Sequence, residues 1–123
     1  GHMPRVVHFE LTGPEPEKLV DFYTKAFGWH FGPMEGLADY WYITTGKRDE
    51  PGINGGLGKG EPIRTVYCCI DVPDLDAVLK AVEENGGKML EARRAIPHTG
   101  WYATFEDPAG NRLGLMEEDQ EAN

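Results

Sequence analysis

The chain has 123 residues, of which 40% are hydrophobic and 27% charged, and this length and composition are typical of one compact domain. The 21 Asp and Glu residues outnumber the 12 Lys and Arg residues, which gives a formal net charge of −9. A nucleic-acid-binding surface needs clustered cations, and the longest basic cluster here is Arg93-Arg94, so nucleic acid is excluded as a partner. The acidic surface leaves neutral or cationic small molecules as candidate ligands.

No apolar run approaches the roughly 18 residues that a membrane-spanning helix needs, and no secretory signal is visible. The adjacent Cys68 and Cys69 point to opposite faces of a strand and are poorly placed to pair, as is typical of cytosolic proteins. We therefore expect a cytoplasmic protein with no membrane partner. Residues 1–3 are interpreted as a remnant of a purification tag, residues 4–118 as a single domain and residues 119–123 as an acidic tail.

The first half of the chain predicts a strand, a helix and three further strands. The helix is indicated by apolar residues that recur with a period of 3.6, and Gly28 is a suitable C-terminal cap. The strands are indicated by β-branched and aromatic residues between Gly- and Pro-rich turns. The expected strands are 5–12, 29–34, 39–45 and 52–57, and the expected helix is 15–27.

The second half repeats this order after a Gly- and Pro-containing linker at 58–62. Asp74 is a suitable N-cap for the second helix, and Gly86-Gly87 ends it. The dipeptide Trp41-Tyr42 recurs as Trp101-Tyr102, so the repeat is visible in residues as well as in element order. The expected strands are 64–71, 88–92, 101–106 and 112–116, and the expected helix is 74–85.

Four segments of the chain resemble the vicinal oxygen chelate superfamily, which includes glyoxalase I, bleomycin-resistance proteins and extradiol dioxygenases. These segments are VVHFEL, EKLVDFYTKAFGW, IDVPDLDAVLKAVEENGG and FEDPAGNRLGLME. The chain is most similar to a glyoxalase-related branch of unknown activity. The resemblance implies an α+β fold of two βαβββ modules, residues 4–58 and 63–118, whose curled mixed sheets surround a U-shaped cavity. It also implies a homodimer.

The resemblance further implies four metal-ligand positions, one on the first and one on the last strand of each module. In this chain they fall on His8, Asn54 or Gly55, Thr65 and Gly114. Imidazole and carboxylate are the usual ligands of such metals, and only His8 is of that kind. We therefore expect no metal and no other cofactor. Two alternatives stay open: Glu10 beside His8 on the same strand face, or His98 reaching in from a loop, could add a ligand.

The candidate catalytic residues are His8 and Glu10, because a carboxylate beside an imidazole orients the ring for general-base work. Alternation along the strands leaves open whether Trp41 or Tyr42, and Trp101 or Tyr102, turns toward the ligand. Arg112 is an alternative partner that would neutralise Glu10. The residues expected to contact the ligand are Trp41, Asn54, Thr65, Tyr67, Cys69, Trp101 and Arg112.

These observations favour a metal-independent protein that binds, or modestly transforms, a small organic ligand through His8 and Glu10. One alternative is a metal-dependent lyase or isomerase of the glyoxalase type with non-standard ligands. A second alternative is a non-catalytic interaction module.

Overall fold

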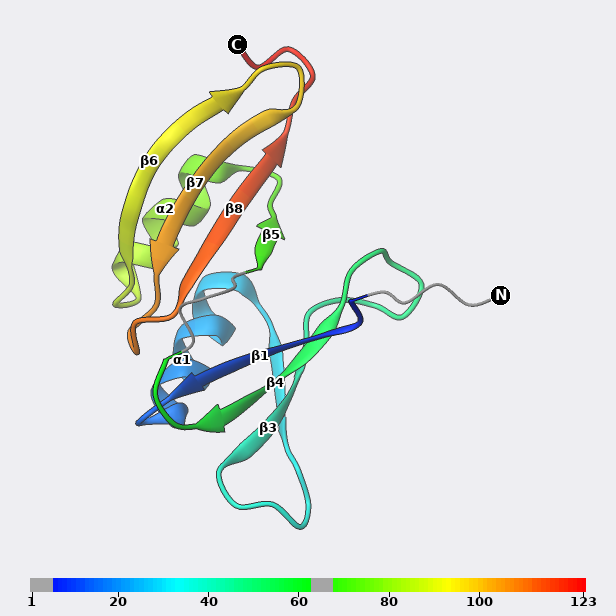
Figure 1. Ribbon diagram of the computed structural model, residues 1–123, viewed down its shortest axis with the longest axis vertical. Helices are drawn as coiled ribbons and strands as arrows, with labels where there is room; N and C mark the ends of the chain where they lie inside the picture. Colours follow the sequence, from blue (N-terminus) through cyan, green and yellow to red (C-terminus); the bar gives the residue numbers. More distant parts are fainter. Residues whose placement is uncertain (1–5, 63–67) are drawn as a thin grey trace.

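The computed structural model describes residues 6–62 and 68–123. Within these residues the chain forms a strand, a helix and three strands, and then the same order again (Figure 1). The elements are β1 (His8–Gly13), α1 (Pro16–Phe27), β2 (His30–Pro33), β3 (Tyr40–Thr44), β4 (Asn54–Lys59), β5 (Cys69–Asp71), α2 (Leu75–Glu84), β6 (Lys88–Ile96), β7 (Gly100–Glu106) and β8 (Arg112–Glu118).

The strands form two separate four-stranded sheets, with the orders β1-β4-β3-β2 (sheet A) and β5-β8-β7-β6 (sheet B). In each sheet the first and last strands of the module pair in parallel, and the other strands pair antiparallel. This confirms the predicted α+β fold of two βαβββ modules with mixed sheets.

Several strands end later in the chain than the sequence predicted, and β4 and β6 show the reason. β4 continues to Lys59 because β1 pairs with it on one side, as far as Gly13, and β3 pairs on the other. β6 continues to Ile96 because it pairs with β7 over its whole length, with two register shifts on the way. Strand pairing extends both elements beyond the point where local sequence signals stop.

Each helix covers one face of its own sheet, and in Figure 1 both helices lie behind the sheets. On β1, Phe9 and Leu11 are buried toward α1, whereas their neighbours are exposed. Phe22 of α1 also contacts Phe105 of β7, with ring centroids 6.2 Å apart, so the two modules share one core. In the described residues, neither helix is long and apolar enough to cross a membrane.

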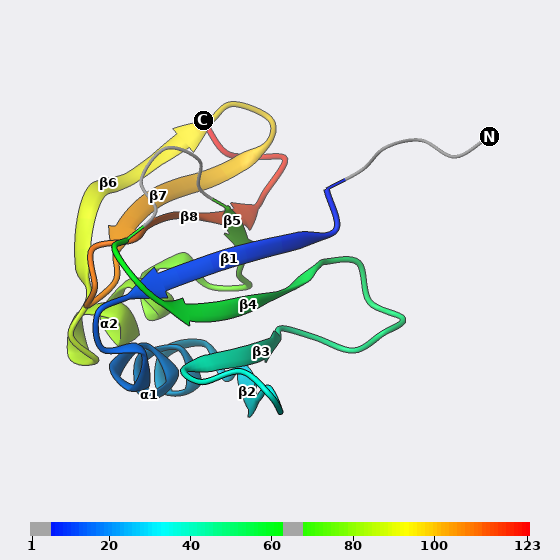
Figure 2. The ribbon, with the colours of Figure 1, turned by 60° about the horizontal axis from the view of Figure 1, so that its bottom comes forward.

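A buried polar network at the β7–β8 turn joins the two modules. The hydroxyl of Tyr23 on α1 donates to Oδ2 of Asp107 at 2.9 Å, and Nδ2 of Asn111 donates to the carbonyl of Thr12 at 2.7 Å. Burial raises the pKa of the Asp107 carboxyl, although hydrogen bonds from Asn111, Tyr23 and Ala109 oppose this shift. The network holds the helix sides of the two modules together, and α1 and α2 lie side by side (Figure 2).

The segment 119–123, which the sequence analysis described as an acidic tail, folds back on the loop between β6 and β7. The amide of His98 donates to the carbonyl of Ala122, and Ala122 is buried. The indole Nε1 of Trp101 donates to Asp119 at 3.1 Å. These contacts make the segment part of the folded domain.

Candidate functional site

The candidate site lies on the face of sheet A that points away from α1. Because side chains alternate along a strand, the residues that flank the buried Phe9 on β1 both lie on this open face. They are His8 and Glu10, so the prediction that these two side chains share a face is confirmed. On β3 the same face carries Tyr40 and Tyr42.

Glu10 is the centre of this group. Its Oε2 accepts hydrogen bonds from Nε2 of His8 at 2.5 Å and from the hydroxyl of Tyr40 at 2.8 Å. A carboxylate can only accept, so the ring proton of a neutral His8 sits on Nε2 and the lone pair sits on Nδ1. Within the described residues, neither Nδ1 of His8 nor Oε1 of Glu10 makes a hydrogen bond. The side chains of His8 and Glu10 are 50% and 40% exposed, so both side chains are accessible to a ligand.

Gly56 makes the contact between Tyr40 and Glu10 possible. It lies on β4 directly opposite Glu10, and a Cβ there would be 1.7 Å from the Tyr40 hydroxyl and 2.6 Å from Oε2 of Glu10. Partial burial and the hydrogen bond to Glu10 raise the pKa of Tyr40 to about 12, so its hydroxyl stays a proton donor at neutral pH. Neither Tyr40 nor Gly56 was predicted as a site residue from the sequence. A glycine inside a strand signals close approach by another group, but it does not say which group approaches.

The second module carries a related arrangement on sheet B. Cys69 of β5 lies opposite Gly114 of β8, and a Cβ on Gly114 would be 2.8 Å from the sulfur of Cys69 and 3.1 Å from the ring of Tyr102. Tyr40 lies two residues before Tyr42, which faces Gly56. Tyr102 lies two residues before Thr104, which faces Gly114. The Trp-Tyr dipeptides of the sequence repeat are therefore offset by two residues and do not occupy equivalent positions.

The described residues at the ligand positions do not fit the metal that the fold family implies. Of the proposed ligand positions, Gly114 offers no donor, and Cys69 and Tyr102 fill the space beside it. Oδ1 of Asn54 already accepts from the amide of Thr45 at 2.8 Å. Thr65 lies outside the described residues. In residues 6–62 and 68–123, no three His, Cys, Asp or Glu side chains are grouped so that they could hold an ion.

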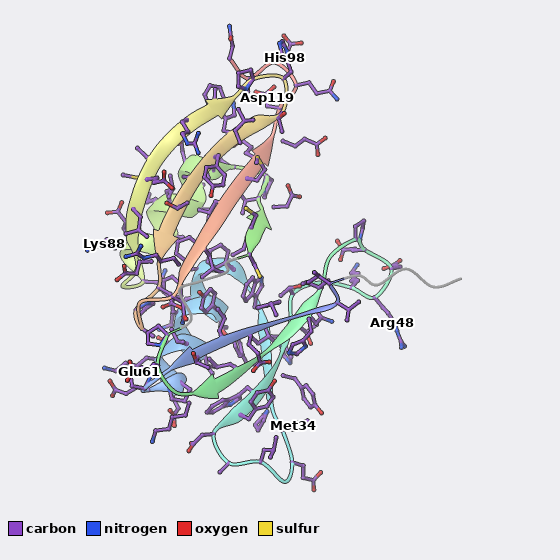
Figure 3. The ribbon with its side chains drawn as sticks, in the orientation of Figure 1. Met34, Arg48, Glu61, Lys88, His98 and Asp119 are labelled. Atoms are coloured by element: carbon purple, nitrogen blue, oxygen red, sulfur yellow. The ribbon has the colours of Figure 1, made fainter. Side chains whose placement is uncertain are left out.

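The two alternative metal ligands, Glu10 and His98, do not complete a metal site in the described residues. Glu10 and His8 are hydrogen-bonded to each other, and in the described part of the chain no third His, Cys, Asp or Glu side chain is grouped with them to hold an ion. His98 lies beside Asp119 at the end of the molecule remote from β1 (Figure 3).

The two predicted tryptophans lie on the helix sides of their sheets. Trp41 pairs with the buried Leu57 and packs against the core. Trp101 lies against the guanidinium of Arg93, which is 4.2 Å from the ring centroid. Their neighbours Tyr42 and Tyr102 lie on the opposite faces of the two sheets, where Tyr42 is exposed and Tyr102 is buried.

Of the other predicted contact residues, Asn54 lies on β4 of sheet A, opposite His8, and the rest lie on sheet B or outside the described part of the chain. Arg112 is 3.9 Å from Glu106 and does not pair with Glu10, which corrects the alternative of a neutralising contact between them. It borders a hollow of about 270 Å³ on sheet B, lined by Leu90, Glu91, Thr104, Arg112 and Leu113. Cys69 is on β5, and Tyr67, like Thr65, is outside the described residues. The structure thus brings together His8, Glu10 and Tyr40, but not the full predicted set.

Comparison with known proteins agrees with this fold. The sequence model of the Glyoxalase/Bleomycin resistance protein/Dioxygenase superfamily matches residues 5–115. A glyoxylase-like domain-containing protein of Didymella fabae is 32% identical over 117 residues, covering 86% of this chain and 91% of that protein. The anthracycline biosynthesis protein DnrV of Streptomyces peucetius is 30% identical over 131 residues, covering 89% of this chain, which spans about half (47%) of DnrV.

Solved structures show the same architecture at low sequence identity. A glyoxalase/bleomycin resistance protein/dioxygenase family enzyme from Burkholderia phytofirmans PsJN superposes with a TM-score of 0.74 at 13% identity, covering 91% of this chain and 97% of that one. The fosfomycin resistance protein FosX of Listeria monocytogenes gives 0.74 at 15% identity, covering 96% of each chain. At these identities the likeness shows the fold alone. Together with the sequence match over residues 5–115, it shows that the chain belongs to the glyoxalase/bleomycin resistance protein/dioxygenase superfamily.

Proposed function

We propose that this chain binds a small organic ligand on the open face of sheet A, at His8, Glu10 and Tyr40, without a bound metal. The observation that carries the proposal is the Glu10 carboxylate, which is oriented by two hydrogen bonds through one oxygen and has its other oxygen accessible. An anchored polar group on an accessible surface is what fixes the orientation of a ligand in a small-molecule site.

The same geometry supports a modest proton-transfer step. Glu10 holds the tautomer of His8 that has its lone pair on Nδ1, so Nδ1 is the atom that would accept a proton from the ligand. The carboxylate would stabilise the imidazolium that forms. The high pKa of Tyr40 keeps its hydroxyl in place as a donor to Oε2 throughout.

We further propose that the chain acts as a homodimer in the cytoplasm. In the described residues β1 and β5 are each paired on one side only. Val6 and Val7, just before β1, are 78% and 73% exposed, and pairing with a second copy would cover them. Both cysteines are free, as expected in a reducing compartment.

A ligand screen tests the proposal. We expect a small molecule from a panel of dicarbonyls, aromatic diols and cationic aromatic compounds to raise the melting temperature of the purified chain. The shift should be lost in His8→Ala and in Glu10→Gln, and kept in the control His98→Ala, which changes a histidine remote from β1. A shift that all three variants keep would place the ligand elsewhere.

Metal analysis separates the proposal from the metal-dependent alternative. We expect less than one equivalent of any divalent ion after purification, and no change in ligand binding after treatment with EDTA. One tightly held ion per chain, lost in His8→Ala, would show a metal site that uses ligands outside the described residues. A chain that binds no small molecule would support an interaction module instead.

A further inference from the structure

We propose that Asn85, at the end of α2, is a site of spontaneous deamidation. The reaction needs only water and is independent of the ligand site on sheet A. Of the asparagines in the chain, Asn54 and Asn85 are each followed by glycine. An Asn-Gly pair reacts readily, because glycine has no side chain to hinder the approach of its backbone nitrogen to the asparagine side chain. The fold treats the two pairs differently.

The reaction joins the backbone of Gly86 to the side chain of Asn85. The nitrogen of Gly86 gives its proton to hydroxide and attacks Cγ of Asn85, and the new N–Cγ bond replaces the Cγ–Nδ2 bond. Nδ2 takes a proton from water and leaves as ammonia, which regenerates the hydroxide. Water then opens the resulting five-membered imide at either of its two carbonyl groups. The product has aspartate or isoaspartate in place of Asn85, and both carry a negative charge at neutral pH.

The pair in β4 is protected by the sheet. Asn54 and Gly55 lie in a strand that is paired on both sides, and Gly55 is buried between Phe9 of β1 and Ile43 of β3. Ring closure requires the peptide bond after asparagine to turn from its extended conformation so that its nitrogen faces the side chain. That turn would break the pairing of β4 with both neighbours. Oδ1 of Asn54 also accepts from the amide of Thr45 at 2.8 Å, which fixes the side chain.

The pair at the end of α2 is held more weakly. Asn85 is the C-cap of α2, and Gly86 follows it with a φ of 96°. Gly86 is exposed, and a Cβ built on it would meet only Pro108, at 3.7 Å. Its amide donates to the carbonyl of Glu83 at 3.3 Å, which is long for a hydrogen bond. Because helix ends fray, this peptide can turn when only the last turn of one helix opens.

Deamidation of Asn85 would weaken the end of α2. Nδ2 of Asn85 donates to the carbonyl of Ala81 at 2.8 Å, and the product carboxylate lacks this donor. The C-terminus of a helix carries a partial negative charge, and Glu83 and Glu84 add two more carboxylates there, so the new charge is repelled. The last turn of α2, which lies within the described residues, has no basic side chain to offset it. The modified chain should therefore be less stable than the parent.

Peptide mapping tests the proposal, because trypsin cleaves after Lys and Arg and so separates the two pairs. The peptide 81–88 contains Asn85 as its one asparagine, and the peptide 49–59 contains Asn54. The folded chain is incubated at mildly alkaline pH, and mass spectrometry follows the deamidated fraction of each peptide. We expect 81–88 to be deamidated at least roughly tenfold faster than 49–59. An equal or faster reaction in 49–59, or no reaction in 81–88, would overturn the proposal.

The same chain unfolded in guanidinium chloride is the matched control. Without the fold both pairs lie in flexible chain, so we expect similar rates in 81–88 and 49–59. A tenfold difference that persists in the unfolded chain would come from the local sequence, and would overturn the argument from the fold. In folded Asn85→Gln, the peptide 81–88 should show no mass gain, because glutamine would have to close a less favourable six-membered ring.

Asn85→Asp reproduces one product and tests its effect on stability. We expect its melting temperature to lie roughly 2–5 °C below that of the parent. Asn123→Asp adds the same charge at the exposed end of the chain and should leave the melting temperature unchanged. Equal losses in the two variants would mean that the overall charge, and not the end of α2, sets the stability, and would overturn this consequence of the proposal.

Discussion

The Tyr40 hydroxyl and the Glu10 carboxylate meet at 2.8 Å directly above the backbone of Gly56. They belong to β3 and β1, which do not pair with each other, because β4 lies between them. The contact therefore spans a whole strand and is possible only where that strand has no side chain. This relationship orients the accessible oxygen of Glu10 on which the proposed ligand site depends.

Gly56→Ala tests this relationship. The new methyl group would lie 1.7 Å from the Tyr40 hydroxyl and 2.6 Å from Oε2 of Glu10, so both side chains must move. We expect a loss of stability of about 1–3 kcal/mol in urea unfolding, together with loss of ligand binding. Gly58→Ala is the control, because its methyl group would meet Tyr40 at an ordinary contact distance of 3.5 Å. If the two variants behaved alike, the close approach over Gly56 would not matter for the site.

The pKa of Tyr40 predicts how stability changes with alkaline pH. The pKa rises from 10.0 to about 12 in the folded chain, so the folded state keeps a proton that the unfolded state loses. The stability that this proton supports is present below pH 10 and is lost as the pH rises to about 12. In Tyr40→Phe this part of the pH dependence should disappear from urea-unfolding profiles. Glu10→Gln keeps the phenol but removes the carboxylate, and its profile should lie between those of Tyr40→Phe and the parent. Parallel profiles for the parent and Tyr40→Phe would contradict the assignment.

Tyr23→Phe tests the link between the two modules. It removes the hydroxyl that donates to the buried Oδ2 of Asp107 at 2.9 Å, while the ring packing in the core remains. Leaving a buried carboxylate with one donor fewer costs about 1–3 kcal/mol. Urea unfolding should show this loss, whereas Tyr42→Phe, which changes an exposed tyrosine, should show almost none. An unchanged stability in Tyr23→Phe would mean that the other donors to Asp107 suffice.

Gly114→Glu tests whether sheet B can regain a metal ligand. Gly114 is one of the four positions at which the superfamily resemblance implies a metal ligand. A Cβ there would lie 2.8 Å from the sulfur of Cys69 and 3.1 Å from the ring of Tyr102. We expect the variant to be less stable than the parent and to bind Ni²⁺ or Zn²⁺ no more tightly, as measured by calorimetry. Adding Cys69→Ala should recover part of the stability by making room. Tight binding of the ion by Gly114→Glu alone would show that the space is available.

Part of the candidate site was predictable because it depends on strand alternation alone. His8 and Glu10 are two residues apart on one strand, so any fold that keeps β1 as a strand puts them on the same face. Tyr40 was not predictable in this way. Its contact with Glu10 depends on the register of β3 and β1 against β4, which the residues of β3 do not reveal by themselves.

The sequence by itself determined the order of strands and helices and their duplication, because periodicity, caps and turn residues act over short stretches of chain. The resemblance of four segments indicated the superfamily. The tertiary structure alone decided which strand faces are open. The docking of α1 and α2 places Trp41 and Trp101 on the helix sides of the sheets and Tyr42 and Tyr102 on the opposite sides, where Tyr42 is exposed and Tyr102 is buried. The tertiary structure also decided that Gly56, rather than a neighbouring glycine, lies beneath the contact between Glu10 and Tyr40, because register is a property of paired strands and not of one.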